Sequence, residues 1–157
     1  MKPEVASIIE KIITIENSGN IDGAKDLLNK LICAVPQDDE LLLQKALFEF
    51  RNNMDFEALL DFCEVYNITK NNEIRDFVLE AYYQPNINQF IECYKKNIKS
   101  ILESDRVFAD NNSITDDINK ACPVWFDELY CVWYDCEEDC FIKVINSYDE
   151  KESEEQN

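Results

Sequence analysis

The segment GNIDGAKDLLNKLICAVP, residues 19–36, holds both glycines of this 157-residue chain. Glycine is favoured just past the C-terminus of a helix, so Gly19 predicts the end of a helix over about 4–18. Asp22 is a favourable N-cap for a second helix, whose apolar residues recur at helical spacing until Pro36 ends it. The segment therefore predicts a hairpin of two short helices.

The same apolar spacing and the polar turns predict four further helices. They are expected over about 40–51, 56–66, 73–83 and 87–103. Together with the first two, they would form about six helices in three consecutive hairpins. The predicted fold class is therefore mainly α, followed by a small C-terminal β-hairpin or α+β cap.

Apolar positions recur 34 residues apart in the first two hairpins, which is the period of a helical repeat. The pairs are Ala24 with Ala58, Leu28 with Phe62, and Leu31 with Val65. With Gly19 and Pro36, these residues resemble the second half of a tetratricopeptide repeat. The resemblance covers about 5–100 and is strongest over 5–72, although Lys70 stands where that family has proline and Glu49 where an aromatic residue is usual. An unrelated array of helical hairpins remains the alternative.

The resemblance implies a binding groove, because the first helix of each tetratricopeptide hairpin lines a concave surface that takes a peptide or a partner's helix. The implied groove residues are Ile9, Ile13, Asn17, Leu43, Leu47, Phe50, Arg51, Arg75, Leu79, Tyr82 and Tyr83. The set is apolar and aromatic with two arginines. The implied ligand is therefore an apolar protein segment or the chain's own C-terminal region.

The character of the chain changes after residue 104. Residues 105–157 hold only 4 of the 15 basic side chains but 15 of the 33 acidic ones. We expect a helical repeat region over 4–104, an acidic C-terminal module over 105–148, and a disordered acidic tail over 149–157.

Two β-rich runs, 129–134 and 141–145, flank a polar tip and predict a β-hairpin. A tip at Glu137 and Glu138 would place Tyr134 opposite Phe141 and Trp133 opposite Ile142. The runs are alternatively the start of a larger sheet. The acidic patch at the tip is interpreted as solvated, because it lacks the pattern of a calcium loop; it comprises Asp135, Glu137, Glu138 and Asp139.

Several chemistries are excluded by composition. The chain has no histidine, so it has no Ser-His-Asp triad, no Cys-His pair and no imidazole metal ligand. Two glycines are too few for a phosphate-cradling loop or a dinucleotide fingerprint. Cys122, Cys131, Cys136 and Cys140 lack the paired Cys-x2-Cys spacing of a zinc knuckle. We therefore expect no catalytic residue, no cofactor and no metal.

The formal net charge of −18 argues against direct binding of nucleic acid or of an anionic membrane. No apolar run reaches the length of a membrane span, and the N-terminus lacks the pattern of an export signal. The odd number of cysteines, seven, then suggests reduced thiols in the cytoplasm.

Three functions are compatible with these patterns. The first is a non-enzymatic module that binds a protein or peptide segment in a helical-repeat groove. The second is an acidic inhibitor or immunity-type protein that blocks a basic, nucleic-acid-binding surface of its target. The third is an accessory N-terminal region of a bacterial glycosyltransferase, since the segments AYYQPN (81–86) and WFDEL (125–129) resemble the helical region of such proteins.

Overall fold

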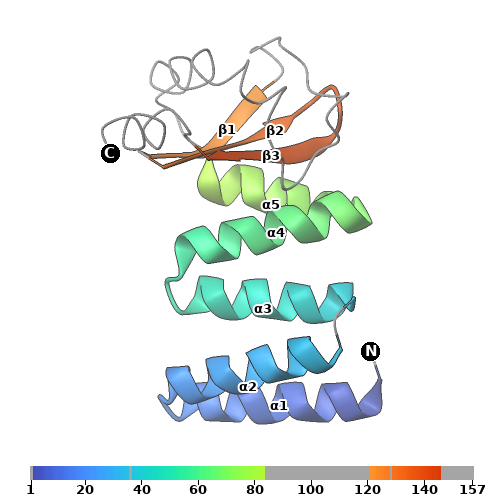
Figure 1. The fold of residues 1–157 in the computed structure, drawn as a ribbon, viewed down its shortest axis with the longest axis vertical. Coiled ribbons are helices and arrows are strands. Elements are labelled where there is room, and N and C mark those ends of the chain that lie inside the picture. Colours follow the sequence, from blue (N-terminus) through green and yellow to red (C-terminus); the bar gives the residue numbers. More distant parts are fainter. Residues whose placement is uncertain (1, 36, 84–120, 128, 146–157) are drawn as a thin grey trace, which may run out of the picture. The chain divides into compact units, whose positions relative to one another are not determined.

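A computed structural model describes residues 2–35, 37–83, 121–127 and 129–145 (Figure 1). The chain divides into two compact units, 1–65 and 66–157, which we call the helical unit and the sheet unit and describe separately. The expected sixth helix (87–103), the expected boundary near 104 and the acidic tail (149–157) lie outside the described residues.

Five helices are present, and they confirm the first five expected from the sequence. They are α1 (Pro3–Asn17), α2 (Ile21–Ala34), α3 (Asp39–Arg51), α4 (Asp55–Thr69) and α5 (Asn72–Tyr82). The boundary between the two units falls within α4. None of the helices in the described part of the chain is both long and apolar enough to cross a lipid bilayer.

The first turn explains both glycines. Gly19 has a φ of +93°, a left-handed conformation that side chains of L-residues disfavour. The backbone N–H of Gly23 donates to Oδ1 of Asn20 at 3.0 Å, so Asn20 is the N-cap and the expectation of Asp22 is corrected by two positions. A Cβ on Gly23 would lie 2.4 Å from the Asn20 side chain. The cap therefore requires a residue without a side chain at position 23.

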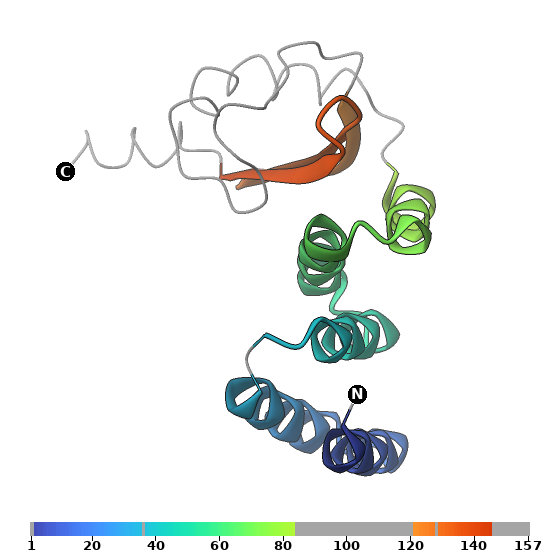
Figure 2. The same ribbon diagram turned by 90° about the vertical axis from the view of Figure 1, so that its right-hand side faces the viewer.

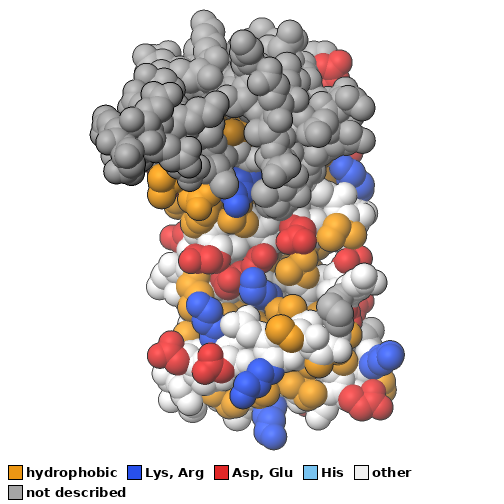
Figure 3. All heavy atoms as spheres, viewed as in Figure 1, with side chains coloured by type: hydrophobic (Ala, Val, Ile, Leu, Met, Phe, Trp, Pro, Cys, Tyr) orange, Lys and Arg blue, Asp and Glu red, His pale blue; other side chains and the backbone are white. Residues whose placement is uncertain are grey.

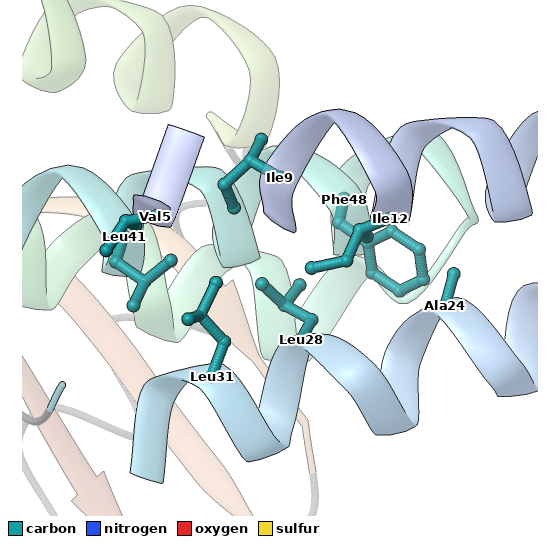
Figure 4. Close-up of a cluster of buried hydrophobic side chains, with 8 residues drawn as sticks. All are labelled: Val5, Ile9, Ile12, Ala24, Leu28, Leu31, Leu41 and Phe48. Atoms are coloured by element: carbon teal, nitrogen blue, oxygen red, sulfur yellow. The ribbon is translucent and has the colours of Figure 1, made fainter. Parts of the chain in front are cut away.

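The core of the helical unit joins its first three helices (Figure 4). Figure 2 shows α1 and α2 nearly end-on and side by side, and Ala24 is fully buried where they pack. The remaining members recur every three or four residues along each helix, as expected for amphipathic helices. The cluster comprises Val5, Ile9, Ile12, Ala24, Leu28, Leu31, Leu41 and Phe48.

The sheet unit contains an antiparallel three-stranded sheet in the order β1-β2-β3. The strands are β1 (Ala121–Phe126), β2 (Tyr130–Asp135) and β3 (Cys140–Ile145). β2 and β3 pair Trp133 with Ile142 and Tyr134 with Phe141, which are the two pairs expected from the sequence. The narrower expectation of a hairpin alone is corrected by β1. Its sequence, ACPVWF, carries a proline that a strand tolerates at a sheet edge, and its pairing shifts between Pro123 and Trp125.

The last turn of α4 joins the sheet through one amide side chain. Asn67 accepts the Phe141 N–H at 2.8 Å and donates to the Phe141 carbonyl oxygen at 2.9 Å. These two backbone groups belong to β3, so the side chain occupies a place that a further strand would take. α5 packs against β1. The sheet is thus tied to helices at both of its outer strands.

Candidate functional site

Five of the expected groove residues lie in the helical unit. Ile13 and Phe50 are large apolar side chains that remain 39% and 38% exposed. Asn17 and Arg51 are also exposed, whereas Leu47 is half-buried. We call this set the α1–α3 surface, because Ile13 and Asn17 belong to α1 and the other three belong to α3.

An ion pair ties the last turns of these two helices together. Arg51 donates from Nε and Nη2 to the two carboxylate oxygens of Glu16 at 3.1 and 2.8 Å. Asn52 Nδ2 adds a third donor to Glu16 at 2.9 Å. The hydrogen bond from Arg51 lowers the pKa of Glu16. Arg51 is therefore already engaged within the chain, rather than available to a partner's carboxylate.

The ion pair brings the α1–α3 residues onto neighbouring helical turns. Residues three or four apart share one face of a helix, so Ile13 lies one turn before Glu16, and Leu47 lies one turn before Arg51. Phe50 is held by an edge-on contact with Phe62, with ring centroids 6.3 Å apart. The arrangement presents two ordered apolar side chains beside an internally satisfied ion pair.

The sequence analysis did not single out Glu16, although its position carried a signal. An acidic residue in the last turn of a helix faces the negative end of the helix dipole, which is unfavourable without a cationic partner. Arg51 supplies that partner from 35 positions further along the chain. Figure 3 shows how apolar and charged side chains alternate over one face of the described helices.

The four expected groove residues of α5 and its C-terminus belong to the sheet unit and are considered there. Tyr82 is only 7% exposed, so it contributes little to any surface, in contrast to the expectation. Arg75 donates from Nε to Oδ1 of its neighbour Asp76 at 3.1 Å, and this bond raises the pKa of Arg75. Leu79 is half-buried, and Tyr83 is exposed.

The acidic turn after β2 differs from the solvated four-carboxylate tip expected from the sequence. Asp135 is fully buried and accepts the backbone N–H groups of Glu137 and Glu138 at 3.0 and 3.1 Å. Asp139 adopts a φ of +56° and is half-buried. Only Glu137 and Glu138 of the expected patch are exposed, because the two aspartates build the turn itself.

Asp139 lies at the centre of a polar cluster that the sequence did not predict. The hydroxyls of Tyr66 and Tyr134 both donate to its Oδ1, and Lys70 Nζ donates to its backbone carbonyl oxygen. These hydroxyl bonds lower the pKa of Asp139, while burial and the facing carboxylate raise the pKa of Tyr134. Phe141 packs on the two tyrosine rings at centroid distances of 5.5 and 5.1 Å. The cluster anchors the turn to α4.

A second polar cluster joins α3 and α4 within the helical unit. Lys45 Nζ lies 2.8 Å from an Asp61 oxygen and 3.7 Å from a Glu49 oxygen. Glu49 is only 3% exposed, and its Oε1 has no hydrogen-bond partner. Burial, reinforced by Asp61, raises the pKa of Glu49 to about 8. The signal in the sequence was an acidic residue at a place where the repeat pattern calls for an aromatic one.

The cysteines of the sheet unit do not gather into one site. Cys131 and Cys140 are buried, whereas Cys122 and Cys136 lie with their sulfur atoms 3.6 Å apart. In the described part of the chain, no three cysteine or carboxylate side chains approach closely enough to hold a metal ion.

Comparison with known proteins adds no relative: no protein-family model, curated protein or solved structure matches this chain.

Proposed function

We propose that residues 1–65 form a tetratricopeptide-like module that binds an apolar segment of a partner protein on the α1–α3 surface. The observation that carries this proposal is the exposure of Ile13 and Phe50 on two helices whose last turns are tied by Glu16 and Arg51. They are the two large apolar side chains left exposed among the described residues of this unit. Such ordered apolar groups gain free energy when a partner removes them from water.

The assignment to the repeat family is supported by burial at the recurring positions. Ala24 and Ala58 are both fully buried, as the close approach of paired helices requires. Leu28 and Phe62 are each 2% exposed. Equivalent positions thus serve as core in two successive hairpins, which is the expected property of a stacked repeat.

The chemistry of the surface favours an apolar ligand over an acidic one. The guanidinium of Arg51 is held by Glu16, so a carboxylate ligand would first have to displace that partner. Asn17 is exposed beside this ion pair and offers an amide for one or two hydrogen bonds. We infer a ligand with apolar side chains and a polar fringe.

We also infer a non-enzymatic role. The chain has no histidine, and the buried carboxylates are already engaged. Asp139 accepts from Tyr66 and Tyr134, and Asp61 is paired with Lys45. These groups support the packing of helices and turn rather than a reaction.

The test is capture of a partner by the immobilised full chain from a lysate of the native host. We compare the wild type with the double variant Ile13→Ser plus Phe50→Ser and with the control Ile68→Ser, whose side chain is 55% exposed elsewhere on α4. The proposal expects a protein that the wild type and the control capture and the double variant loses. Circular dichroism confirms that all three chains keep the same helicity.

Repetition at low and high salt separates the two binding hypotheses. Apolar contacts survive added salt, whereas attraction between an acidic protein and a basic target is screened. Capture that the double variant retains and that high salt abolishes would replace this proposal with the acidic-inhibitor function.

A further inference from the structure

Two cysteines of the sheet unit are placed together by strand pairing. Cys122 lies in β1 opposite Tyr134 of β2, and Cys136 follows the end of β2. The two are 14 positions apart in the chain, yet their sulfur atoms are 3.6 Å apart and share a hydrogen bond. A disulfide requires an approach to about 2.05 Å, which small rotations of the two side chains can supply.

The two thiols differ in their access to solvent. Cys136 is exposed, whereas Cys122 is half-buried and burial raises its pKa to about 11. An oxidant in solution therefore meets Cys136 first, and Cys122 is placed to react second. Cys140, which is nearby in sequence, is buried, and burial raises its pKa to about 11 as well.

We propose that Cys122 and Cys136 form a redox-modification site, at which a small-molecule disulfide oxidises the two thiols to an intramolecular disulfide. The Cys136 thiolate attacks one sulfur of the oxidant, whose S–S bond breaks and releases the first small thiolate. The Cys122 thiolate then attacks the Cys136 sulfur and displaces the second small thiolate. Two protons leave the protein thiols, and two electrons reduce one disulfide to two small thiols.

The bond would join β1 to the turn that follows β2. That turn also holds Asp135, which accepts two backbone N–H groups, and Asp139, which is held by the two tyrosines. Oxidation would therefore link the edge strand to an ordered part of the sheet unit. A dithiol reductant would reverse the reaction by the same exchange steps.

The experiment uses the full chain, with oxidised glutathione as the probe. After incubation under native conditions, free thiols are blocked with a maleimide and the chain is digested without reduction. Trypsin is unsuitable, because no lysine or arginine lies between Lys120 and Lys143. A protease that cleaves before aspartate separates all four cysteines of this region, since cuts at Asp127, Asp135 and Asp139 fall between them.

We expect the linked pair of peptides carrying Cys122 and Cys136 to exceed any other linked pair by about tenfold, as a high effective concentration of one thiol at the other dictates. In denaturant this preference should disappear. The Cys122→Ser variant should leave Cys136 as a mixed disulfide with glutathione, whereas the control Cys33→Ser should keep the cross-link.

A native chain that carries only mixed disulfides at Cys136 would overturn the proposal. So would a yield of the Cys122–Cys136 link that is equal in the native and the denatured chain. The second comparison uses the wild type alone, so it decides the matter even if a serine variant fails to fold.

Discussion

The helical unit and the sheet unit are held together by different kinds of interaction. The helical unit rests on a periodic apolar core, in which each helix contributes residues such as Ile12, Leu28 and Phe48 at regular spacing. The sheet unit depends in addition on single polar side chains that reach across the chain, above all Asn67 and Asp139. A repeated apolar pattern tolerates variation at its edges, whereas a specific clamp depends on one residue.

The largest expected effect tests the apolar side of this comparison. Leu28→Ala should lower the free energy of unfolding of the helical unit by about 3 kcal/mol, because it removes buried methyl groups and leaves a cavity. The measurement is urea denaturation followed by circular dichroism. The control Leu27→Ala, on the same helix but half-buried, should cost clearly less. Equal losses for the two variants would show that Leu28 is not a core residue.

The next effect tests the polar clamp. Asn67→Ala should cost about 2 kcal/mol, since it leaves both the N–H and the carbonyl oxygen of Phe141 without their partner. Amide hydrogen exchange at Phe141 should accelerate accordingly. The exposed Asn72 provides the matched control, because Asn72→Ala removes no such bond. Unchanged protection at Phe141 in Asn67→Ala would refute the clamp.

The smallest effect is a difference in pH dependence. The pKa of Glu49 is raised from 4.5 to about 8, so the folded helical unit holds a proton that the unfolded chain releases. Its stability should therefore fall as the pH rises from about 5 to above 8, by at most about 1.4 kcal/mol per pH unit. The pKa of Asp139 is lowered instead, so the sheet unit should lose stability as the pH falls below about 4.

Urea titrations across pH measure both slopes. Glu49→Gln should flatten the alkaline slope, and Asp139→Asn should flatten the acidic one. Each substitution should leave the other slope unchanged. A wild-type chain whose helical unit gains stability between pH 5 and 8 would contradict the assignment of Glu49.

Local patterns in the sequence were enough for the helices and for part of the sheet. Helical spacing and the Gly19 turn predicted five helices, because apolar periodicity and turn chemistry act over a few residues. Alternation around a polar tip predicted the pairing of Trp133 with Ile142 for the same reason. β1 was missed, because Pro123 disfavours a strand in isolation and its partner lies further along the chain.

The candidate site was less accessible to prediction. Exposure of Ile13 and Phe50 agrees with the implied groove, but Arg51 is occupied by Glu16 from another helix. Tyr82 was expected on a surface and is buried, since helical spacing cannot tell which neighbour covers a face. The acidic residues after β2 were expected in water because their neighbours in sequence are charged.

The sequence by itself determined where helices and the β2–β3 hairpin form, since these follow from interactions between residues close along the chain. Only the tertiary structure decided the role of each polar side chain. Tyr66 donates to Asp139 across 73 positions, and Asn67 binds β3 across 74. A carboxylate beside a turn is solvated or buried according to the donors that packing brings to it, and those donors come from distant segments.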